Sequence, residues 1–139
     1  MVLVDSSAWI EGLRRKGNLD VKLALEGLLD AFEAQICSPV RLEVLGGAGA
    51  PERTRLGRYF SVLPQRDCDR ADWERAVALA WRLRDRGTSV PWMDVLIAAI
   101  ALADDVRVYA VDQHFAAIAQ VTGLRLYTPG HGGAFHPER

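Results

Sequence analysis

The feature that most constrains the fold is an alternation of short, continuously apolar segments with longer segments of helical periodicity. The first apolar segment, Met1-Val-Leu-Val4, has no polar residue, as expected of a strand buried on both faces of a parallel sheet. Strands that alternate with helices predict an α/β fold, here a three-layer α/β/α sandwich around a mainly parallel sheet of about five strands. We expect these strands at residues 2–4, 35–37, 61–64, 106–111 and 124–127.

The predicted helices have recognisable ends. Asp20 is typical of an N-cap, and so is Ser38, which is followed by Pro39 at the first helical position. Residues 69–86 predict a long helix that Gly87 ends. Its inward-facing residues are expected to be Trp73, Val77, Ala80 and Trp81.

Length and composition restrict the class of protein. The 139 residues predict one domain, residues 1–130, and a glycine- and proline-rich tail, residues 131–139, that we expect to be flexible. The net charge of −1 carries no overall signature of nucleic-acid binding, so contact with phosphate requires a local basic patch or a metal ion. The sequence shows no signal peptide and no apolar run of the roughly 20 residues that span a bilayer. We therefore expect a cytoplasmic protein with no membrane contact.

Four acidic residues lie where such a fold places its functional sites, beyond the carboxyl ends of the strands. Asp5 follows the first strand and Asp112 the fourth, whereas Glu43 and Asp94 lie in apolar helical segments. Asp94 is the single charged residue between positions 88 and 103, where an unpaired buried carboxylate would be costly. Carboxylates aimed at one pocket repel one another unless a cation lies among them, so the pattern predicts a divalent metal site.

Each acid also has a simpler interpretation. The three aspartates are each placed to cap a helix, and Glu43 fits a solvated helix surface. Ser6 and Ser7 could cap the first helix themselves, which would leave Asp5 for another role. These alternatives stay open for any single acid, and it is the set of four that favours a metal.

The segments that carry these acids resemble the PIN-domain ribonucleases, most closely the VapC-type toxins of VapBC toxin–antitoxin pairs. The segments are Val-Leu-Val-Asp5-Ser-Ser-Ala-Trp-Ile10, Ser38-Pro-Val-Arg-Leu-Glu43-Val-Leu, Trp92-Met-Asp94-Val-Leu-Ile-Ala-Ala and Tyr109-Ala-Val-Asp112-Gln-His-Phe115. The resemblance implies an Mg²⁺- or Mn²⁺-dependent endoribonuclease that forms a homodimer and is inhibited by a VapB-like antitoxin. It also implies that Asp5 and Asp94 hold the metal and that Glu43 and Asp112 complete the catalytic cluster, with Asp112 as a further candidate ligand.

Residues beside the cluster are candidates for contact with the RNA substrate. Ser7 matches a small polar position next to the first acid, and His114 stands where family members often have a further acid. A solvent-facing histidine at a helix start is an equal alternative for His114. Arg14 and Arg15 are candidates for phosphate binding at the rim, and so are the arginines at positions 82, 84 and 86. Solvated helix ends are the simpler explanation for both groups of arginines.

The chemistry follows from the ligand type. Carboxylate oxygens favour Mg²⁺ or Mn²⁺ over zinc. Such a centre predicts in-line attack by metal-bound water on an RNA phosphodiester, which leaves a 5′-phosphate and a 3′-hydroxyl. A PIN-like module that only binds is an alternative, because Ala110 lacks the hydroxyl with which relatives could orient Asp112. A metal-dependent hydrolase or nuclease acting on another phosphoryl substrate is a further alternative.

The antitoxin contact is expected on the first two helices. The helix that begins near Asp20 has a broad apolar face, which Trp9, Ile10 and Leu13 could extend into a groove for a partner helix. Packing within the chain explains the same residues.

Overall fold

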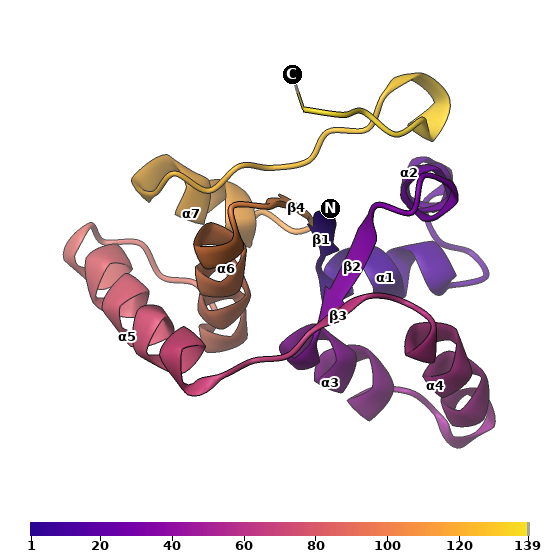
Figure 1. Ribbon diagram of the computed structural model, residues 1–139, viewed down its shortest axis with the longest axis horizontal. Helices are drawn as coiled ribbons and strands as arrows, with labels where there is room; N and C mark the ends of the chain where they lie inside the picture. Colours follow the sequence, from indigo (N-terminus) through magenta and orange to yellow (C-terminus); the bar gives the residue numbers. More distant parts are fainter. Residues whose placement is uncertain (139) are drawn as a thin grey trace.

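A four-stranded parallel sheet forms the centre of the protein, whose computed structural model describes residues 1–138 (Figure 1). The strands are β1 (Val2–Val4), β2 (Ala34–Cys37), β3 (Gln65–Arg66) and β4 (Arg107–Tyr109). They lie in the order β3–β2–β1–β4, and every pair is parallel. Helices cover the sheet, so the predicted α/β fold is confirmed, with β1 in an interior position between β2 and β4.

The described sheet has four strands instead of the five expected. Residues 124–127 make only an isolated parallel bridge, between Val108 and Leu126. Two hydrogen bonds form this bridge, from the amide of Val108 to the carbonyl of Arg125 at 3.0 Å and from the amide of Tyr127 to the carbonyl of Val108 at 2.8 Å. Pro129 then follows, and its missing N–H prevents the pairing from continuing.

The third strand lies later in the chain than the predicted residues 61–64. Helix α4 (Arg53–Ser61) continues into that segment, and β3 begins only at Gln65. Pro64 contributes just its carbonyl oxygen, which accepts from the amide of Ile36 at 3.0 Å. A proline at this point is compatible with the edge of a sheet, because an edge strand leaves one row of backbone groups unpaired.

Helices occupy most of the remaining chain, and their ends differ in detail from the prediction. The others are α1 (Ser6–Leu13), α2 (Leu19–Asp30), α3 (Ser38–Gly46), α5 (Arg70–Asp85), α6 (Trp92–Asp104) and α7 (His114–Val121). Asn18, instead of Asp20, caps α2, since its side chain accepts from the amides of Asp20 and Val21. Ser38 is the first residue of α3, and its hydroxyl accepts from the amide of Cys68 at 2.8 Å.

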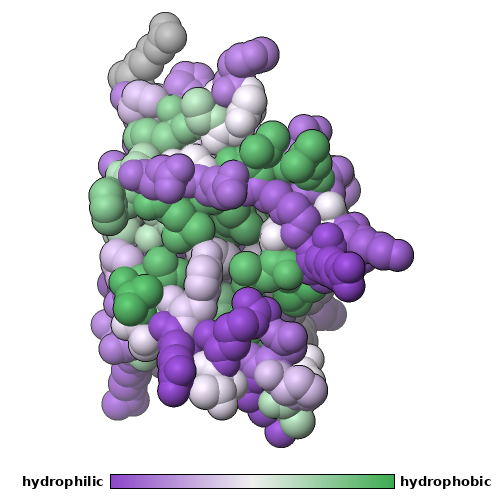
Figure 2. All heavy atoms as spheres, turned by 90° about the vertical axis from the view of Figure 1, so that its right-hand side faces the viewer, coloured by the Kyte–Doolittle hydropathy of each residue, from purple (hydrophilic) through white to green (hydrophobic). Residues whose placement is uncertain are grey.

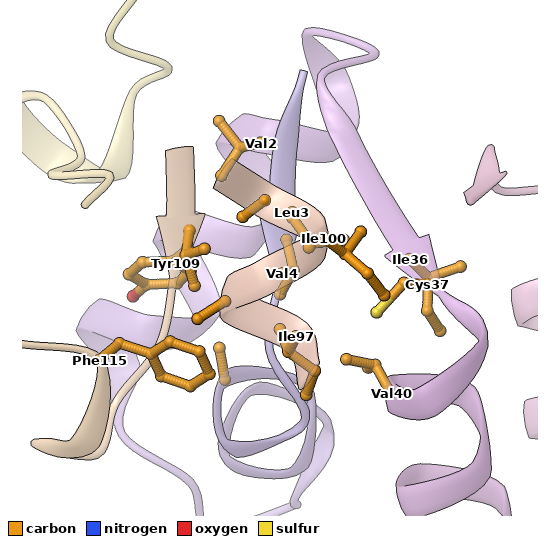
Figure 3. Packing of buried hydrophobic residues seen from close by; sticks show 14 of the residues in the cluster. Val2, Leu3, Val4, Ile36, Cys37, Val40, Ile97, Ile100, Tyr109 and Phe115 are labelled. Carbon is orange, nitrogen blue, oxygen red and sulfur yellow. The ribbon is translucent and has the colours of Figure 1, made fainter. Parts of the chain in front are cut away.

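The core lies between the sheet and α6 (Figure 3). All three residues of β1 are completely buried, and α6 is buried at every position from Asp94 to Ala101. Ile97 and Ile100 of α6 point toward the strands, and Phe115 of α7 fills the space beside Tyr109. The central position of α6 explains its nearly continuous apolar sequence, because a helix surrounded by protein needs no polar face.

Helix α5 buries a different face from the predicted one. Leu79 and Leu83 are its buried apolar residues, whereas Trp73, Val77 and Trp81 are 56%, 46% and 66% exposed. Of the four residues expected to point inward, only Ala80 packs against the core, where it is partly buried. Ion pairs determine this orientation. Asp72 is fully buried, and it binds Arg66 of β3 through two hydrogen bonds of 2.7 and 2.9 Å. Arg66 also pairs with Asp104 at the end of α6, so it fixes α5 against both neighbours.

The C-terminal segment lies against α2 within the described residues. Gly133 has a φ of +85°, and a Cβ there would lie 2.5 Å from the carbonyl carbon of Leu23, so only glycine fits. Phe135 stacks on Tyr127 with a centroid distance of 6.2 Å, and Arg107 donates to the carbonyl of His136 at 2.8 Å. The flexibility of residues 131–139 in solution stays a prediction. Among residues 1–138, each helix is too short or too polar to span a lipid bilayer.

Candidate metal centre

The ends of β1 and β4 bring two of the predicted acids to one edge of the sheet. Asp5 directly follows β1, and its amide still donates to the carbonyl of Tyr109, the last residue of β4, at 2.9 Å. Asp112 lies shortly beyond Tyr109. Parallel strands end at the same edge, so the two aspartates meet despite their separation in the chain. Burial raises the pKa of Asp5, and the charge of Asp112 raises it further.

Asp5 uses one carboxylate oxygen to cap α1 and leaves the other without a partner. Oδ2 accepts from the amide of Ser7 at 3.0 Å and from its hydroxyl at 2.7 Å. Oδ1 is buried and accepts no hydrogen bond from any residue between 1 and 138. The expectation that Ser6 and Ser7 free Asp5 from capping is therefore wrong. One oxygen of the carboxylate caps the helix, and the other is left unpaired, which is costly unless a cation meets it.

Glu43 belongs to the same cluster. It lies on α3, half-buried, and its Oε1 accepts from the hydroxyl of Ser6 at 3.0 Å. Burial raises the pKa of Glu43, and the charges of Asp5, Asp94 and Asp112 raise it further. A solvated surface glutamate would feel neither effect, so that simpler interpretation does not apply.

Asp94 also belongs to the cluster. It lies in the first turn of α6 and is 6% exposed. Burial raises the pKa of Asp94 to about 6, with a further contribution from the charge of Asp5, and the hydrogen bond from His114 opposes both. Asp94 is no helix cap, because α6 follows Pro91 and has no side-chain capping bond.

Asp112 and His114 complete the arrangement. The Nδ1 atom of His114 lies 2.7 Å from Oδ2 of Asp94 and 3.6 Å from Oδ1 of Asp112. Asp112 Oδ1 also accepts from the backbone amide of His114 at 3.0 Å. Ser7 supports this segment, since its hydroxyl accepts from the amide of Val111 at 3.0 Å. A hydroxyl at position 110 is therefore not needed to connect the Asp112 segment to Asp5.

Four of the residues predicted to contact the substrate lie in two separate places. Ser7 and His114 contact the acids directly. Arg14 and Arg15 lie at the end of α1 and line a separate groove. The role of Ser6 escaped the sequence analysis, because its partner Glu43 is 37 positions away and no local pattern connects the two residues.

The donor set fits a hard divalent cation. Four carboxylates of like charge meet at the sheet edge, and one buried oxygen of Asp5 has no partner among the described residues. Donor atoms of Asp94, Asp112 and His114 lie within 4.8 Å of one another. Oxygen-rich sites of this kind suit Mg²⁺ or Mn²⁺, and Asp5, Asp94 and Asp112 are the residues that would hold the ion.

Comparison with known proteins identifies the class. The PIN domain family profile matches residues 2–121, which is most of the chain. Ribonuclease VapC11 of Mycobacterium tuberculosis is 34% identical over 130 residues, covering 90% of this chain and 96% of that protein. The chain therefore belongs to the PIN-domain family, among its VapC-type members.

Solved structures have the same fold. VapBC2 from Rickettsia felis, bound to a DNA fragment from its promoter, has a chain that superposes with a TM-score of 0.74 at 19% identity, covering 91% of this chain and 98% of that one. A toxin–antitoxin complex from Klebsiella pneumoniae has a chain with a TM-score of 0.68 at 23% identity, covering 91% and 100%.

Proposed function

We propose that this protein is a metal-dependent endoribonuclease and the toxin of a toxin–antitoxin pair. The observation that carries the proposal is the buried, unpartnered Oδ1 of Asp5 within a cluster of four acids. Similarity to Ribonuclease VapC11 over 90% of the chain supports RNA as the substrate. The acids alone would repel a phosphodiester, so substrate binding requires the cation.

The residues of the cluster have distinct roles in this mechanism. Asp5, Asp94 and Asp112 would hold Mg²⁺ or Mn²⁺, which would supply a water of lowered pKa and neutralise charge on the phosphate. Ser7 holds Asp5 through two hydrogen bonds. Glu43 has a raised pKa and is fixed by Ser6, so it is suited to accept a proton from the attacking water.

Cleavage assays with matched variants test the proposal. Wild type with Mn²⁺ should cleave RNA to fragments with 5′-phosphates, whereas Asp5→Asn and wild type in excess EDTA should be inactive. Glu26→Gln removes an exposed negative charge from the middle of α2 and serves as the control, which should keep full activity. Cleavage that persists in EDTA, or products with 2′,3′-cyclic phosphates, would refute the metal mechanism. RNA binding without cleavage or metal uptake would indicate a binding module.

We propose that the antitoxin docks in the groove between α1, α3 and α4 (residues 10–15, 44–48 and 52–56). The groove has a volume of about 420 Å³, and its apolar lining includes Ile10, Leu13, Val44 and Leu56. The charged residues of the lining are Arg14, Arg15, Arg55 and Glu52, so basic side chains predominate, which suits an apolar helix flanked by acidic residues. This location differs from the expected one on α2, because Val21, Leu25 and Leu28 of α2 are buried within the chain. Trp9 also takes no part, since it is completely buried against Phe60.

Figure 2 views the side of the molecule that carries α2 and α4, and it shows hydrophobic residues gathered in the middle and upper parts of this side, crossed by a row of hydrophilic ones. Ile10, 45% exposed, is the groove residue whose apolar surface is most available. Ile10→Glu should therefore weaken binding of a co-expressed antitoxin without affecting cleavage, because Ile10 contacts none of the four acids. Unchanged antitoxin affinity in this variant would contradict the assignment.

We further propose that the homodimer forms through the aromatic face, defined as Trp73, Val77, Trp81 and Trp92 of α5 and α6. These residues are between 46% and 77% exposed, and all four line a groove of about 550 Å³. Monomeric proteins rarely expose apolar side chains in such a continuous group. Tryptophan is also the residue that contributes most strongly to protein interfaces.

A further inference from the structure

We propose that His114 is a nitrogen ligand of the cation held by the acid cluster, and that it shifts the preference of the site from Mg²⁺ toward Mn²⁺. The inference rests on the proposed function for the existence of the cation. It goes beyond that function by adding a ligand that is not a carboxylate and by selecting between the two metals.

The geometry places the imidazole among the carboxylate donors. Nδ1 of His114 lies 2.7 Å from Oδ2 of Asp94 and 3.6 Å from Oδ1 of Asp112. In an octahedral site with ligands about 2.1 Å from the metal, neighbouring donor atoms lie about 3.0 Å apart. The two observed separations lie on either side of this value, so all three atoms can become neighbours around one ion with small side-chain movements.

The backbone holds the histidine in this position. His114 is the first residue of α7, and its amide donates to Oδ1 of Asp112 at 3.0 Å. The backbone bond between His114 and Asp112 therefore keeps the ring of His114 close to the carboxylate of Asp112. The side chain of His114 is 45% exposed, which leaves room for waters or a substrate oxygen on the open side of the site.

A second observation indicates that the cluster needs a bound cation. Oδ1 of Asp5 is buried without a partner among the described residues, although Asp5 is near enough for its charge to raise the pKa of Asp94. A hydrogen bond from His114 to Asp94 leaves this oxygen unsatisfied. A metal ion bound by Asp94, Asp112 and His114 in addition to Asp5 would satisfy all four side chains.

The imidazole changes the metal preference for a chemical reason. Mg²⁺ takes oxygen ligands almost exclusively and keeps several of its waters. Mn²⁺ also favours carboxylates, but as a first-row transition metal it binds an imidazole nitrogen more readily than Mg²⁺ does. A site with three carboxylates and one imidazole should therefore favour Mn²⁺ over Mg²⁺ more than an all-carboxylate site does.

Pulsed electron paramagnetic resonance of the Mn²⁺-loaded protein tests the ligand directly. The wild-type spectrum should contain the nitrogen coupling of a bound imidazole, and ¹⁵N-histidine labelling should convert its ¹⁴N lines to ¹⁵N lines. The His114→Asp variant, which keeps a donor at this position, should bind Mn²⁺ and lack the coupling. His131→Gln, on the short helix at residues 131–133, should retain it and is the matched control.

Calorimetric titration measures the selectivity of the site for Mn²⁺ over Mg²⁺. The ratio of Mn²⁺ to Mg²⁺ affinity should fall by at least about tenfold in His114→Asp, since even outer partners of metal ligands change affinity by that factor. Bound Mn²⁺ without imidazole coupling in the labelled wild type would overturn the inference and leave the proposed function standing. Wild type that binds no Mn²⁺ at all would overturn both.

Discussion

Asp94→Asn should make the metal-free protein more stable while it abolishes catalysis. Asp94 is buried among like charges, and its ionised form is held in the folded state at a cost in free energy. Asparagine has nearly the same shape and carries no charge, so it removes the repulsion and the desolvation of an ion. A residue kept for metal binding should destabilise the protein when the metal is absent.

The magnitude follows from the pKa of Asp94, which is raised from its ordinary value of 3.8 to about 6. At about 1.4 kcal/mol per pH unit, the ionised carboxylate lowers the free energy of unfolding by about 3 kcal/mol at pH 8. The hydrogen bond from His114 opposes the rise in the pKa of Asp94, so its contribution is already included in this figure. The gain of about 3 kcal/mol corresponds to a rise in Tm of about 10 °C for a chain of this size.

The stability advantage of Asp94→Asn over wild type should increase with pH. Because the folded pKa is raised, the stabilising effect of the protonated carboxyl is complete below pH 3.8 and is lost as the pH rises through about 6. At pH 4.5 the cost to wild type falls to about 1 kcal/mol, because Asp94 is then mostly protonated in the folded protein. The advantage of Asp94→Asn should therefore be about 3 kcal/mol at pH 8 and about 1 kcal/mol at pH 4.5.

Thermal unfolding in EDTA, followed by circular dichroism at both pH values, measures this difference. Glu26→Gln serves as the control for removal of an exposed charge, and its Tm should match that of wild type. Adding Mn²⁺ at 100 times its Kd should stabilise wild type by about 2.7 kcal/mol and Asp94→Asn much less. The reasoning is refuted if Asp94→Asn is less stable than wild type at pH 8, or if Mn²⁺ stabilises both equally.

Three further predictions concern other parts of the structure. Ser6→Ala removes a bond that lowers the pKa of Glu43, so the acidic limb of the pH–rate profile should move to higher pH, with Ser61→Ala as an unaffected control. Arg66→Ala leaves Asp72 buried without its main partner and should lower the free energy of unfolding in urea by about 3 kcal/mol; a loss below 1 kcal/mol would contradict the role given to this pair. Trp81→Glu should convert the dimer to a monomer in size-exclusion chromatography with light scattering, whereas Phe32→Glu, at an 88% exposed aromatic outside this face, should remain dimeric.

The acids could be predicted because each lies in a local pattern that has a physical meaning. Asp5 and Asp112 follow apolar strands, and parallel strands deliver such residues to one edge. Asp94 interrupts an apolar helix, which is costly without a compensating partner. In each case the sequence neighbours of the acid carry the information, so no tertiary contact is needed to recognise it.

Other features depend on contacts between distant segments and had no local signal. The orientation of α5 was predicted from its tryptophans, but the buried pair of Asp72 with Arg66 turned these residues outward. The fifth strand was predicted from its apolar residues, but strand formation requires a neighbour in register, and only one bridge forms. Hydrophobicity alone does not say which of two apolar faces a helix buries.

By itself the amino-acid sequence determined the alternation of strands and helices, the parallel sheet and the set of acids, since periodicity and strand ends are properties of neighbouring residues. Only the tertiary structure decided how those acids are held. Ser6 bonds Glu43, Ser7 connects Asp5 to the Asp112 segment, and His114 reaches Asp94. These contacts join positions from 20 to 104 residues apart, so they exist only once the sheet has brought the segments together.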